Sequence, residues 1–124
     1  MGARILVAED SEAISSFLAD HLTTMGHTVT VVDDGVKLLR QAGEIRPHLI
    51  ITDIQMPGSS GSSAYLSLQK DEKTKGIPAI FISAHPAESL APDTPSTRYL
   101  QKPIDFKKFA KFVAELLPLG GYRP

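Results

Sequence analysis

The chain contains no cysteine, and its apolar N-terminal stretch is too short for a signal peptide or a membrane span. Without cysteine there is no disulfide, no thiolate metal site and no cysteine nucleophile, which fits a reducing compartment such as the cytoplasm. The 13 basic and 14 acidic residues give a formal net charge of −1, so a strong positive field is absent too. We therefore expect neither direct binding of nucleic acid nor association with a membrane.

The length of 124 residues suits one domain with a buried core, and no internal linker divides it. Pro118 is expected to end the last helix, because proline cannot continue one. We assign residues 1–118 to the domain. Residues 119–124 are expected to form a C-terminal tail or the start of a linker, since Gly120 and Gly121 follow Leu119.

Apolar runs that end in polar residues alternate with segments of helical periodicity, the pattern of a doubly wound α/β fold with a parallel sheet. The expected strands cover residues 4–8, 28–32, 49–51, 77–83 and 99–101. Expected caps are Ser11, Gly26, a serine within 59–63, and Asp105, while Asp33 and Asp34 belong to a turn. The expected inward faces are Ile14, Phe17, Leu18, His21, Leu22 and Met25; Val36, Leu39 and Ala42; Ala64, Tyr65 and Leu68; and Phe106, Phe109, Ala110, Val113 and Leu116.

Polar side chains stand where these strands end, and parallel strands place all their carboxyl ends along one edge of the sheet. Four of the five strand ends can converge there if the second strand lies outside. Helix caps and turns account for Asp33 and Asp34, but they do not account for a lysine that follows the last strand and faces several carboxylates. The strand ends are Glu9 with Asp10, Asp33 with Asp34, Asp53, Ser83 and Lys102.

Three neighbouring carboxylates repel one another by about 1 kcal/mol per pair in water, and by more in a partly dry site. Lys102 supplies one compensating charge. A hard divalent cation with oxygen ligands, such as Mg²⁺, would supply the rest. A carboxylate beside such an ion can attack phosphorus, because metal and lysine neutralise the charge of the transferred group. Asp53, at the end of a strand expected to be buried on both faces, is the candidate nucleophile.

The chain resembles the receiver domain of two-component response regulators over essentially its whole length. Each element is weak alone, but together they stand in the family's order and at the expected strand ends. These elements are Glu9-Asp10, Asp53 followed by Met56-Pro57, Gly61, Ile77-Pro78, Ser83-Ala84, and Tyr99 three residues before Lys102-Pro103.

This resemblance implies a flavodoxin-like, five-stranded sheet of order 2-1-3-4-5. It also implies that Asp53 accepts a phosphoryl group from a phosphohistidine on a sensor histidine kinase or a histidine phosphotransfer domain. Glu9, Asp10, Asp53 and the backbone carbonyl of Gln55 would hold Mg²⁺, with Mn²⁺ as an alternative ion. Self-phosphotransfer and autodephosphorylation would be its only chemistry, with no separate small-molecule substrate.

The remaining motif residues receive roles by the same resemblance. Lys102 would pair with the phosphoryl oxygens, Ser83 would be the switch hydroxyl, and Tyr99 the aromatic residue that moves with it. Gln55 and His85 would flank the phosphoryl group and tune its hydrolysis. Output would go through an unknown downstream protein.

The segment between Ser83 and Tyr99 departs from the family pattern. It is short, it lacks the usual Gly-Ala pair, and prolines at 86, 92 and 95 leave only residues 87–91 free. We expect a shortened or irregular fourth helix and a reshaped output face. Ser59 and Ser60 also stand where bulkier loop residues are common in the family.

Three other functions are weighed against this one. A degenerate receiver could dock a partner without phosphorylation, although the complete residue set argues against it. A flavodoxin-like mononucleotide binder would need a phosphate loop where Glu9 and Asp10 stand. An aspartate-nucleophile phosphatase would need its nucleophile after the first strand and a second aspartate two residues later, where Glu12 stands.

Overall fold

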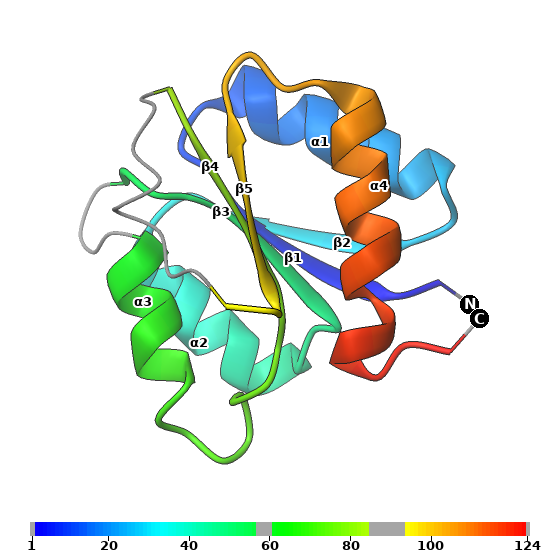
Figure 1. Cartoon of the computed structure of the whole chain (residues 1–124). Coiled ribbons are helices and arrows are strands. Elements are labelled where there is room, and N and C mark those ends of the chain that lie inside the picture. The colour runs from blue at the N-terminus through cyan, green and yellow to red at the C-terminus, as the bar shows by residue number, and fades with distance from the viewer. Residues whose placement is uncertain (1, 57–60, 85–93, 124) are drawn as a thin grey trace.

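The computed structural model describes residues 2–56, 61–84 and 94–123, and these form a five-stranded parallel sheet between two layers of helices (Figure 1). The strand order β2-β1-β3-β4-β5 confirms the predicted doubly wound, flavodoxin-like topology. The strands are β1 (Arg4–Ala8), β2 (Thr28–Val32), β3 (Leu49–Asp53), β4 (Ala79–Ser83) and β5 (Thr97–Gln101). The helices are α1 (Glu12–Thr24), α2 (Gly35–Ile45), α3 (Gly61–Leu68), α4 (Phe106–Leu116) and the short 3-10 helix η2 (Pro118–Gly120).

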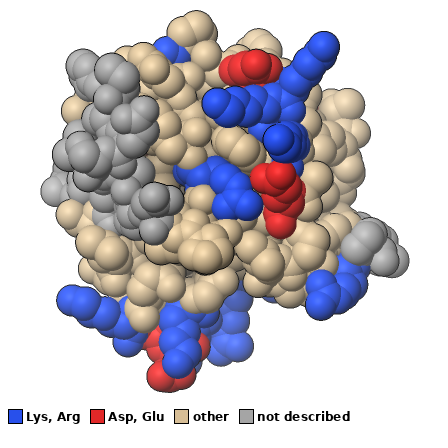
Figure 2. Space-filling model, in the orientation of Figure 1, with Lys and Arg blue, Asp and Glu red and all other residues tan. Residues whose placement is uncertain are grey.

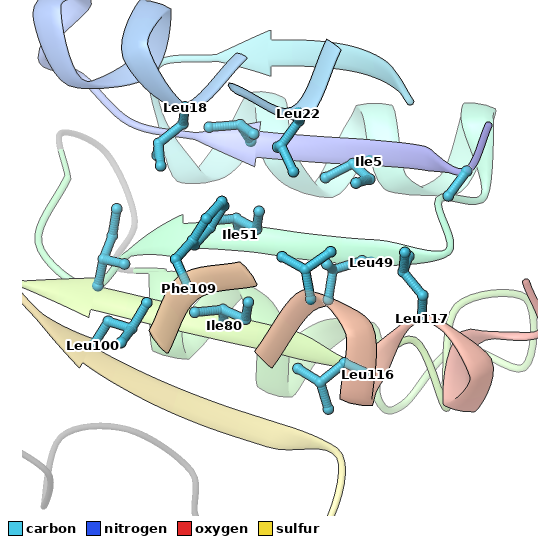
Figure 3. Close-up of a cluster of buried hydrophobic side chains, with 14 residues drawn as sticks. Ile5, Leu18, Leu22, Leu49, Ile51, Ile80, Leu100, Phe109, Leu116 and Leu117 are labelled. Atoms are coloured by element: carbon cyan, nitrogen blue, oxygen red, sulfur yellow. The ribbon is translucent and has the colours of Figure 1, made fainter. Parts of the chain in front are cut away.

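Helices α1 and α4 cover one face of the sheet, and α2 and α3 cover the other. Because successive side chains of a strand point to opposite faces, Leu49 and Ile51 join the α1/α4 core while Ile50 joins the α2/α3 core. Figure 3 shows Phe109 of α4 lying against the sheet beside Ile51. Every residue of β3 and β4 is buried, as expected for central strands covered on both faces.

Side-chain caps fix where three helices begin, and all three were expected as cap or turn residues. Ser11 accepts a hydrogen bond from the Ile14 amide at the start of α1 (3.4 Å). Asp34 accepts one from the Lys37 amide (2.7 Å), and Asp105 accepts one from the Lys107 amide (3.0 Å). Each such cap contributes about 1 kcal/mol to helix stability, so the loops that leave the carboxyl edge of the sheet are well anchored.

The exposed positions of two helices differ from the expected inward faces. On α2 the predicted Ala42 is buried and Leu39 packs against the core, but Val36 is 52% exposed, and Leu38, which was not predicted, is buried. On α1, Phe17 is 58% exposed and Met25, just beyond the last helical residue, is 42% exposed. Both helices carry more apolar residues than the sheet can cover, and periodicity alone does not say which remain outside.

Most other predicted details agree with the structure. His21 packs against the Phe106 ring, as expected for a helix-packing histidine, with ring centroids 4.8 Å apart. Gly26 adopts φ +94° just after α1.

The bounds of two strands differ from the prediction. Strand β3 reaches Asp53 itself, and β4 begins at Ala79, after Pro78, rather than at residue 77. The expected irregular fourth helix and His85 fall largely or wholly within residues 85–93, and Ser59 and Ser60 within 57–60, all outside the described residues.

Among the residues that the structure describes, no helix is long and apolar enough to cross a membrane.

The segment after α4 folds back onto the amino-terminal ends of the strands. Leu117 is buried, and the Tyr122 ring makes edge contacts with His27 and His48, at centroid distances of 5.9 and 5.5 Å. Part of the segment expected as a tail therefore packs against the domain. The domain boundary at residue 118 stays a prediction.

These two histidines predict how stability depends on pH. His27 Nδ1 accepts a hydrogen bond from the Ala3 amide and His48 Nδ1 accepts one from the Arg4 amide, both at 3.0 Å, which requires neutral rings. Burial lowers the pKa of both side chains, and Arg4 adds to the effect at His48. A lowered folded-state pKa gives stability that is present above the ordinary histidine pKa of about 6.5 and is lost below it.

We expect the free energy of unfolding, measured by urea denaturation, to fall as the pH is lowered from 7 to 5. The double variant His27→Gln/His48→Gln should show a smaller fall. An unchanged pH dependence in that variant would contradict the assignment.

Candidate phosphoacceptor site

The carboxyl ends of four neighbouring strands bring the predicted site residues together. Glu9 and Asp10 follow β1, Asp53 ends β3, Ser83 ends β4, and Lys102 follows β5. Strand β2 lies at the outer edge beyond β1, as the argument from strand ends required. Asp33 and Asp34, which follow β2, have other partners: Asp33 pairs with Lys37 at 2.8 Å, and Asp34 caps α2.

Lys102 sits between two carboxylates at the centre of this site. Its Nζ lies 2.9 Å from Asp53 Oδ2 and 2.9 Å from Glu9 Oε1. Exposure of the three side chains is low: 0% for Glu9, 8% for Asp53 and 18% for Lys102. Burial by itself lowers the pKa of the Lys102 ammonium, but Asp53 and Glu9 outweigh it and leave that pKa above its ordinary value. The lysine is therefore firmly cationic.

Glu9 is the carboxylate held furthest from water. Burial is the main cause that raises its pKa above the ordinary value, and the charge of Asp53 adds to it. The Ser11 amide, which donates to Oε2 at 3.0 Å, and Lys102 act in the opposite direction. Apart from the Lys102 ion pair, the buried Oε1 has no hydrogen-bond partner among the described residues. A further positive charge near this oxygen would lower the cost of its burial.

Asp53 is held from both sides while its carboxylate stays at the edge of the sheet. Its Oδ1 accepts a hydrogen bond from the Gln55 amide (3.1 Å), and Oδ2 faces Lys102. The backbone beyond it is fixed by the Ile54 amide, which donates to the Ile82 carbonyl (3.0 Å). This arrangement orients the carboxylate before any partner arrives. Gln55 itself is exposed.

The site has the donor set of a hard cation. One carboxylate oxygen from each of Glu9, Asp10 and Asp53 lies within 4.8 Å of the others, and Asp10 is exposed. Oxygen ligands from carboxylates with room for water are what Mg²⁺ requires. Together with the buried Glu9 Oε1, which has no hydrogen-bond partner besides Lys102 among the described residues, these residues fit the ion that the sequence implies.

Ser83 and Tyr99 lie on the neighbouring strands β4 and β5. Ser83 is 1% exposed, and its carbonyl accepts a hydrogen bond from the Lys102 amide at 2.7 Å. Tyr99 is half-buried, lies opposite Phe81 in the β4–β5 ladder and packs against the core on the α2/α3 side. The roles that the sequence gives to both residues stay predictions. His85 lies outside the described residues.

The sequence did not indicate the apolar groove that opens beside Lys102. It has a volume of about 590 Å³ and lies between α1 and the loop from β5 to α4. The Phe17 and Phe106 rings meet in it with centroids 4.6 Å apart. Phe17 was expected to face the core, so the apolar pattern of α1 contained the signal but assigned it to the interior. Its lining is Ala13, Ile14, Phe17, Leu18, Lys102, Pro103, Ile104 and Phe106.

A family model described as the response regulator receiver domain matches residues 5–114. The chain belongs to this family. The match confirms the resemblance inferred from the strand-end motifs, and it identifies the protein as a receiver domain of two-component signalling.

Known relatives and solved structures agree with this assignment. Protein PilH of Pseudomonas aeruginosa is 33% identical over 121 residues, with 93% of this chain and 98% of PilH covered. RpaA of a Synechocystis strain, named as a DNA-binding transcriptional regulator, is 31% identical, but the chain spans only 48% of it. It likewise spans only 24% of the response regulator PleD of Caulobacter vibrioides.

Among solved structures, the receiver domain of a Pseudomonas aeruginosa sensor histidine kinase superposes with a TM-score of 0.85. The identity is 24%, and 95% of this chain and 99% of that chain are covered. That structure is described as having a magnesium ion coordinated in its active-site cleft. At this identity, the structural likeness is evidence for the fold alone.

The acidic cluster predicts a specific pattern of metal affinity. Replacing Asp10 with Asn removes one carboxylate of the cluster, and we expect Mg²⁺ affinity to fall by about tenfold or more. Asp33→Asn is the matched control, because Asp33 follows β2 and pairs with Lys37 instead. Isothermal titration with MgCl₂ measures both. Equal affinities of the two variants would show that Asp10 is not a ligand.

Proposed function

We infer that this receiver domain is a phosphorylation switch of a two-component phosphorelay in which Asp53 is the phosphoacceptor. The observation that carries the inference is the oriented Asp53 carboxylate, with Lys102 2.9 Å away and two further acids beside it. In the reaction, a carboxylate oxygen of Asp53 forms a bond to phosphorus as the nitrogen–phosphorus bond of a phosphohistidine breaks. The histidine nitrogen keeps the electron pair and takes up a proton.

Glu9, Asp10, Asp53 and the Gln55 carbonyl would hold Mg²⁺, and Mn²⁺ suits the same oxygen donors. The bound ion would neutralise negative charge on the transferred group. Lys102 is already cationic and within reach of Asp53, so it would pair with phosphoryl oxygens as it now pairs with the carboxylate. The exposed Gln55 side chain and His85 would tune the access of hydrolytic water.

Output would begin at Ser83 and Tyr99. We propose that the buried Ser83 hydroxyl turns toward the phosphoryl group and that Tyr99, on the neighbouring strand, changes its packing in response. The β4–β5 ladder brings the two residues close, since Phe81 opposite Tyr99 lies two residues before Ser83. The downstream partner would be a protein that binds the changed surface.

The phosphoryl donor would be a sensor histidine kinase or a histidine phosphotransfer domain. The apolar groove beside Lys102 supports this, since a donor that brings its histidine to Asp53 must cover the adjoining surface of α1. We further propose a cytoplasmic receiver domain over residues 1–118, with no membrane contact, no direct nucleic-acid binding and no separate small-molecule substrate.

Intact mass spectrometry after incubation with acetyl phosphate and MgCl₂ tests the proposal. We expect a gain of one phosphoryl group that is lost on chelation and in Asp53→Asn but kept in the control Asp33→Asn. In the same samples, NMR shifts at Tyr99 should follow the adduct in the parent and be reduced in Ser83→Ala. A folded, Mg²⁺-binding protein without the adduct would favour a docking module that works without phosphorylation.

A further inference from the structure

The edge of the sheet opposite Asp53 holds a second hollow, with a volume of about 480 Å³. It lies where the loops that enter β3 and β4 meet β1 and the segment around η2. Four cationic side chains line it, from Arg4, Arg46, Lys73 and Lys75, and no acid is among the described lining residues. In a chain of net charge −1, this is a local concentration of positive charge.

We propose that this hollow, here called the basic pocket, binds a small soluble molecule that carries two or more phosphate groups. Figure 2 shows Lys and Arg atoms gathered at the lower end of the molecule, around the loop that joins α3 to β4 in Figure 1. Some acidic atoms lie among them, and Lys75 pairs with Glu72 at 3.0 Å. Arg46 and Lys73, however, make no ion pair within the described part of the chain.

Arg4 is oriented before any ligand arrives. Its Nε donates to the Ile45 carbonyl at 3.0 Å and its Nη2 to the Arg46 carbonyl at 2.8 Å, which fixes one edge of the guanidinium group. Within the described residues, its Nη1 has no hydrogen-bond partner. A guanidinium group held on one edge presents its other edge to an anion with little loss of side-chain entropy, and its fork suits phosphate oxygens.

Arg46 stands in a backbone conformation that favours glycine. It caps α2 with φ 46° and ψ 69°, in the left-handed region, where an L-side chain is strained. Two other residues that line the pocket at positive φ, Gly76 and Gly121, are glycines. Backbone strain at a charged residue beside a hollow is typical of a functional position. We therefore expect the Arg46 side chain to contact the ligand.

The rest of the lining suits an organic molecule rather than a bare ion. Pro47, Ile77 and Leu119 contribute apolar surface, and the volume lies within the range of small-molecule sites. Asp53 is the last of the five residues of β3, and His48, at the pocket, directly precedes that strand, so the two residues are about 16 Å apart. A ligand in the basic pocket would therefore not compete with the phosphoryl group.

Titration of ¹⁵N-labelled protein with tripolyphosphate and with ATP, in EDTA to exclude a metal-bridged complex at Asp53, tests the proposal. We expect saturable chemical-shift changes at the amides of Arg46, Gly76 and Gly121. ATP should bind more tightly than tripolyphosphate, because its nucleoside can contact the apolar surface of the pocket. Arg46→Gly should weaken binding at least fivefold while raising the thermal midpoint, because it relieves the left-handed strain. Lys73→Gln should weaken binding, and Lys111→Gln, on α4 and outside the lining of the pocket, should not.

If Lys111→Gln weakened binding as much as Lys73→Gln, the affinity would depend only on the net charge of the protein, and the proposal would be overturned. Full affinity in Arg46→Gly, or shifts centred on Asp10 and Asp53, would also overturn it. A lipid headgroup shares the phosphate chemistry, so the second arm uses phosphatidylcholine vesicles with phosphatidylinositol 4,5-bisphosphate. Binding to these vesicles that free tripolyphosphate does not displace would contradict a soluble ligand.

Discussion

The ion pairs of Lys102 with Glu9 and Asp53 are the constraint on which the rest of the site depends. Two carboxylates with almost no exposure to water cannot stay close together as anions without a compensating cation. Lys102 reaches them only because β5 and β1 lie on either side of β3 and β4 with all carboxyl ends at one edge. The strand order is therefore a requirement of the charge arrangement, as well as of the packing.

One lysine compensates this cluster only in part. Two acids pair with a single ammonium group while Asp10 lies beside them, and the raised pKa of Glu9 reflects burial that the lysine does not fully offset. The same imbalance would favour a bound cation and, in the proposed function, a phosphoryl group held through it. Packing on both faces of the sheet holds the acids in place, so the charges cannot simply move apart. In this domain, the rigid core is what keeps the repelling carboxylates close together at the edge of the sheet.

Much of this could be read from the sequence because each strand end carries its own signal. The apolar run before Asp53, the acids after the first strand and the lysine after the last required only parallel topology to bring them together. The helix caps at Ser11, Asp34 and Asp105 were equally local. What the sequence could not decide was the choice among apolar residues. Val36 and Phe17 remain exposed while Leu38 is buried, because the outcome depends on how each helix rotates against the sheet.

The surfaces that need three-dimensional proximity were also hidden. The groove beside Lys102 joins α1 to a loop some ninety residues later, and the basic pocket joins residues from four separate segments. No spacing in the chain marks either surface. Likewise, the packing of Tyr122 on His27 and His48 follows from the return of the chain after α4 to the start of β2 and β3. Only the folded arrangement shows these contacts.

The stability of Lys102→Met, measured by urea denaturation in chelator and in Mg²⁺, tests the central claim most directly. We predict that the free energy of unfolding falls by on the order of 2 kcal/mol in chelator, because two nearly buried carboxylates lose their cation. Mg²⁺ should restore much of this loss, while the control Lys111→Met should be unaffected in both conditions. Equal stability of Lys102→Met and the parent in chelator, or a deficit that Mg²⁺ leaves unchanged, would contradict the account.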